Sequence, residues 1–181
     1  NIEMVLSDAL HKMRNLMDLR TIEGDSVILN IESVEIGALI AKITRDHKAL
    51  AARKNITLTT DVASLEVLSD KLAITRIVDQ LLSNAIKFSP IGSNIQIVLK
   101  GNQEFAEFSV IDGGYGIKEE EKVNLFKKFK VLSTHATGGE SKTGLGLFIA
   151  QCNADLLSGK ISYENDVNSR FTLKIPILKL A

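Results

Sequence analysis

Apolar residues recur at two different spacings along the chain, and the spacings divide it into helices and strands. Spacing by three and four residues predicts helices at residues 2 to about 20, Val34 to about Arg53, Lys71 to Phe88, Lys118 to Phe129 and Gly144 to about Ser158. Alternation of apolar and polar residues predicts strands at Val27–Ile31, Ile56–Thr60, Glu66–Ser69, Asn94–Gly101, Glu104–Asp112, Lys160–Glu164 and Arg170–Ile177. Asp70 is predicted to be the N-cap of the helix that follows it.

The first predicted helix has an apolar seam of the kind found in helical bundles. Ile2, Leu6, Ala9, Met13 and Leu16 are spaced alternately four and three residues apart. Such a seam needs a partner helix, and no helix of comparable pattern precedes it in the sequence. We therefore expect the partner to lie outside this chain or to come from a second copy of it.

One predicted strand ends in an aspartate, Asp112, that is a candidate site residue. Alternation puts Asp112 on the same face as three apolar residues, which are Ala106, Phe108 and Val110. Burying a carboxylate is costly unless a donor meets it. The glycines in the following stretch, Gly113–Ile117, let a backbone approach whatever supplies that donor. The alternative is an ordinary strand that ends in an Asp-Gly turn.

A polar stripe follows one edge of the helix predicted at Lys71–Phe88. It consists of Gln80, Asn84, Lys87 and Phe88, next to the apolar arc. An amide and an ammonium group one turn apart suit a metal-bound phosphate, but an ordinary amphipathic edge would look the same.

Two pairs of glycines precede helices, and charge distinguishes them. Gly114 and Gly116 come before the helix predicted at Lys118–Phe129, whose first turn holds three glutamates that would repel a phosphate. This loop is a better place for a base or ring. Gly144 and Gly146 follow Lys142 and Thr143 without any acid, so an anion is expected there. Between them, residues 130–143 lack periodicity, as functional or disordered loops do.

Composition limits the kinds of partner and the compartment that we expect for this chain. The 181 residues include 22 Lys and Arg against 22 Asp and Glu, so net charge favours neither nucleic acid nor an anionic membrane as a partner. One cysteine permits no internal disulfide and fits a reducing compartment. No apolar run approaches the roughly 18 residues of a membrane span, and no signal peptide is visible. A start at Asn1 instead of Met indicates a piece of a longer protein.

Several motifs, in this order, resemble the nucleotide-binding boxes of sensor histidine kinases. They are Asn84 with Lys87, Asp112-x-Gly114-x-Gly116, the pair Phe126 and Phe129, and Gly144-x-Gly146 after a flexible loop. The resemblance implies an α/β (α+β) two-layer sandwich, in which helices cover one face of a mixed, mostly antiparallel sheet, with an N-terminal bundle helix. Residues 16–24 resemble the end of the second helix of the dimerisation and phosphoacceptor hairpin. The implied divisions are 1–24 for that helix, 25–53 for a connecting strand and helix, and 54–181 for the ATP-binding domain.

The resemblance also implies roles for individual residues. Asp112 would accept from the adenine amino group, Asn84 would hold Mg²⁺ against the phosphates, and Lys87 would meet phosphate. Residues 130–143 would form a mobile lid. Asn84 and Lys87 would be the catalytic residues, and the further nucleotide contacts implied are Phe88, Gly114, Gly116, Ile117, Phe129, Lys142, Thr143, Gly144, Leu145, Gly146 and Leu147.

The implied function is that of an ATP-dependent protein histidine kinase that uses ATP and Mg²⁺. The implied partners are a response-regulator receiver domain and, through the N-terminal helices, a second copy of the full-length protein. A cytoplasmic location is expected for this fragment, whether or not the parent protein is anchored in a membrane. Two alternatives remain: an ATP-binding scaffold without kinase activity, and an ATP hydrolase of the topoisomerase, mismatch-repair or chaperone kind.

Some positions depart from the family pattern. Gln80 stands where the family often has asparagine, Gly113 replaces a more usual asparagine, and Lys142 replaces a glycine. The stretch from His11 to Asn15 faintly resembles the acceptor box, but it lacks the proline and the acidic residue of that box. We therefore predict that this fragment lacks the acceptor histidine.

Overall fold

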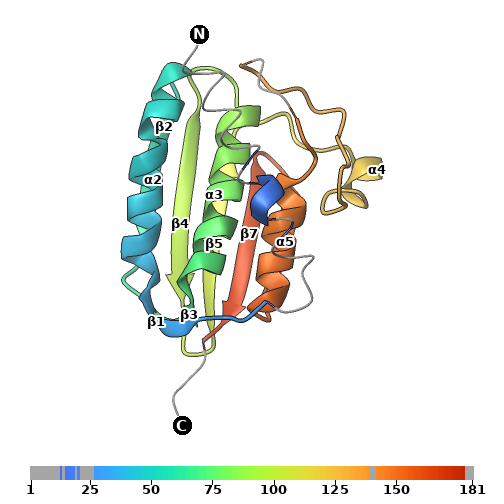
Figure 1. Cartoon of the computed structure of the whole chain (residues 1–181). Coiled ribbons are helices and arrows are strands. Elements are labelled where there is room, and N and C mark those ends of the chain that lie inside the picture. Colours follow the sequence, from blue (N-terminus) through green and yellow to red (C-terminus); the bar gives the residue numbers. More distant parts are fainter. Residues whose placement is uncertain (1–12, 14, 19, 21–26, 139–141, 178–181) are drawn as a thin grey trace.

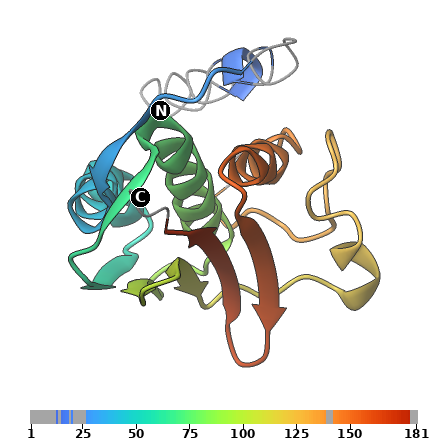
Figure 2. The same ribbon diagram turned by 90° about the horizontal axis from the view of Figure 1, so that it is seen from below.

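Three long helices cover one face of a five-stranded sheet in the computed structural model, which describes residues 13, 15–18, 20, 27–138 and 142–177 (Figures 1 and 2). The strands are β1 (Ile31–Glu35), β2 (Thr57–Val62), β3 (Glu66–Asp70), β4 (Asn94–Gly101), β5 (Phe105–Asp112), β6 (Lys160–Asn165) and β7 (Ser169–Pro176). The helices are α2 (Ile36–Arg53), α3 (Lys71–Phe88), the single turn α4 (Glu119–Lys122) and α5 (Gly146–Leu156).

The sheet is mixed and mostly antiparallel. Its strand order is β2-β4-β5-β7-β6, in which β2 and β4 are parallel and the other neighbours are antiparallel. β1 and β3 form a separate antiparallel pair. The predicted two-layer α/β fold is confirmed. The described residues of the predicted N-terminal helix, which are 13, 15–18 and 20, are helical, and the rest of that helix lies outside the described residues.

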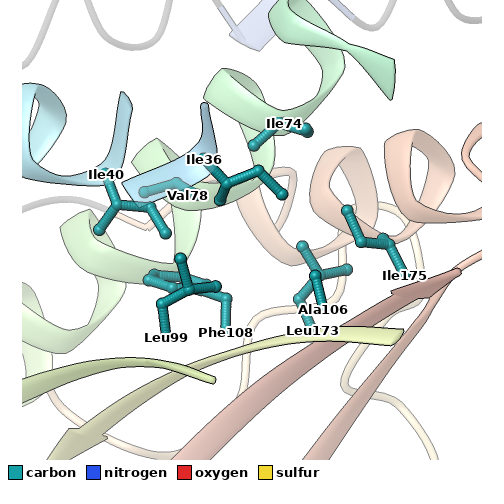
Figure 3. A pocket seen from close by; sticks show the side chains of 9 residues that line it. All are labelled: Ile36, Ile40, Ile74, Val78, Leu99, Ala106, Phe108, Leu173 and Ile175. Carbon is teal, nitrogen blue, oxygen red and sulfur yellow. The ribbon is translucent and has the colours of Figure 1, made fainter. Parts of the chain in front are cut away.

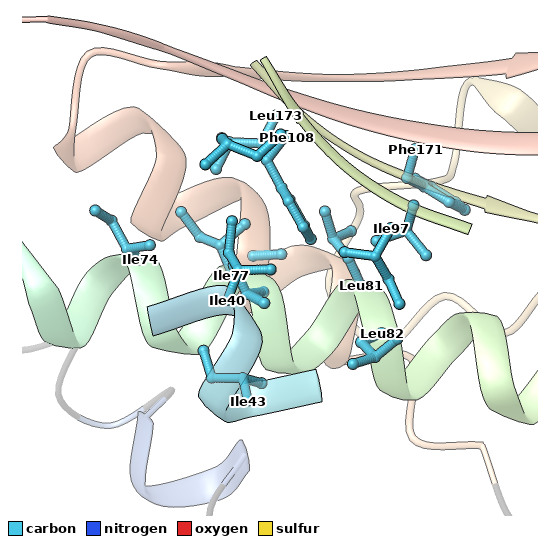
Figure 4. Close-up of a cluster of buried hydrophobic side chains, with 14 of the residues drawn as sticks. Ile40, Ile43, Ile74, Ile77, Leu81, Leu82, Ile97, Phe108, Phe171 and Leu173 are labelled. Atoms are coloured by element: carbon cyan, nitrogen blue, oxygen red, sulfur yellow. The ribbon is translucent and has the colours of Figure 1, made fainter. Parts of the chain in front are cut away.

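The core lies between the helices and the inner face of the sheet (Figure 4). The inward residues predicted for α3 are all buried: Ile74, Ile77, Val78, Leu81, Leu82 and Ala85. Opposite them, β4 contributes Ile95, Ile97 and Leu99, and β5 contributes Ala106, Phe108 and Val110. Each buried Ile, Leu or Phe stabilises the fold by about 1.5–3 kcal/mol, so α3 is fixed firmly between α2 and α5.

Two carboxylates cap the N-termini of the long helices. The carboxylate of Asp70 accepts from the Ala73 N–H at 2.8 Å, which confirms the predicted N-cap of α3. Glu35, which sequence did not single out, caps α2 through the N–H groups of Gly37 and Ala38 and also accepts from the Leu65 N–H. These backbone hydrogen bonds, that from Leu65 foremost, lower the pKa of Glu35.

Two predicted elements were wrong. The strand predicted at Val27–Ile31 instead starts at Ile31, where β1 begins its pairing with β3. The helix predicted at Lys118–Phe129 is helical only at Glu119–Lys122. Its remainder forms turns that bury Leu125 and end at Phe129, whose positive φ of 59° is incompatible with a right-handed helix. A single helical turn has only a weak dipole, so the dipole separates a base site from a phosphate site less than predicted.

A small hollow lies in the core between α2, α3 and the sheet (Figure 3). Its lining is entirely apolar: Ile36, Ile40, Ile74, Val78, Leu99, Ala106, Phe108, Leu173 and Ile175. At about 10 Å³ it has room for roughly one water molecule and offers that water no hydrogen-bond partner. It is a packing defect and not a ligand site.

A buried lysine supports the C-terminal end of α3. Lys54 is 7% exposed, and its ammonium group donates to the carbonyl oxygens of Ile86 and Lys87 at 2.7 and 3.0 Å. We expect Lys54→Met to lower the free energy of unfolding by about 2 kcal/mol, because charge-assisted hydrogen bonds to helix-end carbonyls are lost. Chemical denaturation measures this change. The exposed Lys48→Met on α2 is the control, and equal stability of the two variants would contradict the prediction.

No helix in the described part of the chain combines the length and the apolar character needed to cross a membrane.

Candidate functional site

The predicted site residues on α3 face the beginning of α5 and the end of β5. A Cβ atom built on Gly146 would lie 2.5 Å from the Oε1 atom of Gln80 and 3.8 Å from the Nδ2 atom of Asn84. On the other side, a Cβ atom on Gly114 would lie 3.4 Å from the carbonyl oxygen of Phe88. Segments far apart in the sequence thus meet around the C-terminal half of α3.

Asp112 is buried at the end of β5, on the same side as the core residues of that strand. Its side chain is 4% exposed, and Oδ1 accepts from the Gly114 N–H at 2.7 Å. Burial raises the pKa of Asp112 from its ordinary value of 3.8 to about 6, although the Gly114 hydrogen bond opposes the rise. A carboxylate kept in so costly a place is a strong acceptor for a ligand donor.

Two glycines of the site have positive φ and are crowded by neighbours. Gly116 has φ of 74°, and a Cβ atom there would meet the Asn165 side chain at 2.3 Å. Gly144 has φ of 67°, and a Cβ atom there would lie 2.7 Å from the backbone of Phe129 and of Lys130. Any other residue at either position would be strained and would displace its neighbour.

The loop after Asp112 is fixed by a tyrosine that the sequence did not reveal. The backbone N–H of Ile117 donates to the Tyr163 hydroxyl at 2.9 Å, and that hydroxyl also hydrogen-bonds Ser169 at 3.0 Å. Tyr163 and Ser169 belong to the β6–β7 hairpin. Because the contact joins residues 46 apart in sequence, no local pattern could have predicted it.

Two ammonium groups flank the ring of Phe88. The Nζ atoms of Lys87 and Lys142 lie 5.7 and 5.9 Å from the ring centroid, within cation–π range. Lys142 also donates to the carbonyl oxygens of Leu132 and Thr134. Positive charge from α3 and from the loop thus lies beside Phe88, at the same end of the site.

The remaining predicted contacts lie around the start of α5. Thr143 accepts from the Leu145 N–H at 3.3 Å, Leu145 is buried, and Leu147 packs against the core. Phe129 is 59% exposed, and its N–H donates to the Gly144 carbonyl oxygen at 3.0 Å. The buried Leu145 can thus reach a ligand more readily through its backbone than through its side chain, whereas the exposed ring of Phe129 is free of the core and its N–H is already hydrogen-bonded.

Comparison with known proteins agrees with this arrangement. Residues 69–179 match the family described as histidine kinase-, DNA gyrase B-, and HSP90-like ATPase. The chain belongs to this ATPase family. It is similar to the swarming motility regulation sensor protein RssA of Serratia marcescens, with 31% identity over 97% of this chain and 38% of that protein. This chain therefore spans about two fifths of the length of that relative.

Two solved histidine kinase structures have the same fold. The histidine kinase AdeS of Acinetobacter baumannii superposes with a TM-score of 0.77 at 27% identity, over 97% of this chain and 80% of that one. The catalytic domain of the histidine kinase ThkA superposes with a TM-score of 0.72 at 26% identity, over 82% of this chain and 99% of that one. Within the ATPase family, the chain is a catalytic domain of the sensor histidine kinase type.

The donor set suits the Mg²⁺ and ATP that are typical of this ATPase family. Among the described residues, no group of three or more His, Cys, Asp or Glu side chains forms a metal cage. Mg²⁺ does not need one, because it commonly binds through one or two side-chain oxygens together with substrate phosphates. Asn84 is available for such a role on the half-buried edge of α3, facing Gly146.

The described part of the loop at residues 130–143 is held by polar contacts and by Leu132, which packs against the core. Thr137 donates from its N–H to the Lys87 carbonyl oxygen at 3.1 Å and from its hydroxyl to Ser89. Ser133 donates from its N–H and its hydroxyl to the Glu121 carboxylate, both at 2.7 Å. These hydrogen bonds lower the pKa of Glu121. Neither anchor was predicted from sequence, and neither is an apolar contact.

Hydrogen bonds at the surface are readily replaced by hydrogen bonds to water, so we expect the loop to open without nucleotide. Amides of residues 133–138 and 142 should exchange fast in the chain alone and become protected when an ATP analogue and Mg²⁺ are added. Hydrogen exchange measured by mass spectrometry tests this, with buried α3 amides as an internal control. The same protection in both states would exclude a lid function.

Proposed function

We propose that this chain binds ATP with Mg²⁺ and transfers the γ-phosphoryl group to a histidine on a phosphoacceptor helix. The observation that carries the proposal is the buried Asp112 carboxylate beside the Gly114–Gly116 loop, at the end of α3 where the cationic groups gather. A buried acceptor suits the adenine amino group, and the polar edge of α3 suits the phosphates.

In this proposal the residues mainly position the nucleotide and neutralise its negative charge. Asp112 accepts from the adenine amino group, while Phe88 and Ile117 line the space near the base. Asn84 holds Mg²⁺, which neutralises phosphate charge, and Lys87 and Lys142 supply further positive charge. Gly144 and Gly146 allow the backbone around the α5 N-terminus to approach the phosphates, with Thr143, Leu145 and Leu147 beside them.

A histidine kinase is favoured over an ATP hydrolase by the residue at position 80. Hydrolases of the wider superfamily resemble one another in placing a glutamate one turn before the asparagine, where this chain has Gln80. A carboxamide cannot take a proton from water. We therefore expect only weak ATPase activity, and a turnover of about 1 s⁻¹ or more would contradict the assignment. A scaffold without kinase activity would use the same pocket.

The experiment that separates a kinase from a scaffold is phosphoryl transfer. The parent protein, extended N-terminally by one helical hairpin arm, should form acid-labile phosphohistidine when incubated with labelled ATP and Mg²⁺. The present chain should bind ATP without becoming labelled, because its acceptor histidine is expected to be missing. His11 lies outside the described residues. Label in the present chain that disappears in His11→Gln would make His11 the acceptor.

The wider context follows from the same proposal. The phosphoryl group would pass to an aspartate of a response-regulator receiver domain, and the full-length protein would dimerise through its N-terminal helices. Residues 1–24, 25–53 and 54–181 would be the partial hairpin helix, the connector and the ATP-binding domain. We place the fragment in the cytoplasm, without contact to nucleic acid or membrane.

A further inference from the structure

Two described residues of the N-terminal helix, Asn15 and Asp18, make polar contacts with α3. The described residues of this helix lie over α3 and α5 on the side away from the sheet (Figure 2). The Asp18 carboxylate meets the Arg76 Nε atom at 2.8 Å, and the Asn15 Oδ1 atom accepts from the Gln80 Nε2 atom at 2.7 Å. Both pairs follow one face of the helix and one edge of α3.

The pair of amides is buried, unlike an ordinary surface contact. Asn15 is 2% exposed and Gln80 is 4% exposed. A buried amide that loses its partner is destabilised, so the hydrogen bond strongly restricts the Gln80 side chain. It joins residues 65 apart in the sequence.

The other end of the Gln80 amide reaches the nucleotide site. Its nitrogen donates to Asn15, and its oxygen faces the start of α5. There a Cβ atom on Gly146 would lie only 2.5 Å from that oxygen. The absence of a side chain at Gly146 thus makes room for Gln80, one helical turn from Asn84.

We propose that Asn15 is a positioning residue for the nucleotide site: it holds Gln80 so that the Gln80 oxygen lies beside Gly146 and Asn84. The inference rests on the proposed function, in which Gly146 and Asn84 lie at the phosphate end of the nucleotide. Binding of Mg²⁺ and ATP then depends on the hydrogen bond between Asn15 and Gln80.

Asn15 would strengthen nucleotide binding because it preorganises the Gln80 side chain. A glutamine side chain that is free to rotate loses rotamer entropy when it is fixed, and Asn15 removes that cost before the nucleotide arrives. An oxygen fixed near Asn84 also suits Mg²⁺, which prefers oxygen ligands. By linkage, nucleotide binding would strengthen the hydrogen bond between Asn15 and Gln80 by the same factor.

The test is a double-mutant cycle with calorimetric titration. Asn15→Ala should weaken binding of a non-hydrolysable ATP analogue with Mg²⁺ about tenfold, as expected for one lost hydrogen bond of about 1.4 kcal/mol. Adenosine affinity should not change, because Asp112 is untouched. In Gln80→Asn, whose side chain is too short to reach Asn15, adding Asn15→Ala should have no further effect.

Asp18→Asn is the matched control, because it weakens the other polar pair of the same helix and leaves Asn15 in place. We expect it to change analogue affinity by less than about twofold. Equal loss in Asp18→Asn and Asn15→Ala, equal loss for adenosine, or additive loss in the double variant would each overturn the positioning role. A parent chain that binds no analogue would instead refute the proposed function, whereas Asp112-dependent binding unaffected by Asn15→Ala would refute only this inference.

Discussion

Replacing Asp112 by asparagine is expected to abolish ATP binding and at the same time to stabilise the folded chain. The amide presents a donor or a neutral acceptor to the adenine amino group and forfeits the charged hydrogen bond. We expect affinity for ATP, and equally for adenosine, to fall by about a hundredfold or more, which corresponds to about 3 kcal/mol. Calorimetric titration of the folded variant measures this loss.

The gain in stability follows from the raised pKa of Asp112. A carboxyl whose pKa rises from 3.8 to about 6 on folding stabilises the fold most below pH 4 and loses that contribution as pH rises through 6. The difference corresponds to at most about 3 kcal/mol at neutral pH. Asp112→Asn should therefore unfold at higher denaturant concentration than the parent at pH 7.5, with a smaller difference at pH 5.

Two controls accompany this experiment. The exposed Asp61→Asn on β2 should leave adenosine affinity unchanged. In the parent chain, adenosine affinity should decline as pH falls below about 6, because protonated Asp112 no longer accepts as a carboxylate; adenosine carries no phosphate that would titrate in the same range. Unchanged adenosine binding in folded Asp112→Asn would refute the adenine assignment.

Replacing Asn84 by alanine is the second change with a large expected effect. In the proposed function it removes the side-chain oxygen for Mg²⁺ and leaves the adenine end of the site intact. We expect affinity for an ATP analogue in the presence of Mg²⁺ to fall tenfold to a hundredfold, as for the loss of a charge-assisted contact. Affinity for adenosine should stay at the parent level.

The measurement compares analogue binding with and without Mg²⁺. Parent affinity should rise on addition of Mg²⁺, whereas Asn84→Ala should respond little. Ser83→Ala, at the neighbouring half-buried position of α3, is the control for helix stability. If Asn84→Ala kept the full response to Mg²⁺, the metal role of Asn84 would be wrong.

Sequence was sufficient where a residue's environment follows from local periodicity. The burial of Asp112 followed from its place in the alternation of β5, and the inward face of α3 followed from its helical spacing. The Asp70 cap followed from the preference for a short acceptor before a helix. Periodicity failed at residues 118–129, because the burial of Leu125 and the left-handed conformation of Phe129 depend on neighbours outside that segment.

The contacts that complete the site were decided by the tertiary structure alone. Lys54 at the end of α3, Tyr163 beneath Ile117 and Asn15 behind Gln80 each join segments distant in sequence. A hydrogen-bond partner is selected by three-dimensional proximity and by the cost of leaving a buried polar group unpaired, and neither quantity is visible in local spacing. The sequence by itself therefore determined the layers and the motifs, whereas packing decided which side chains hold those motifs in place.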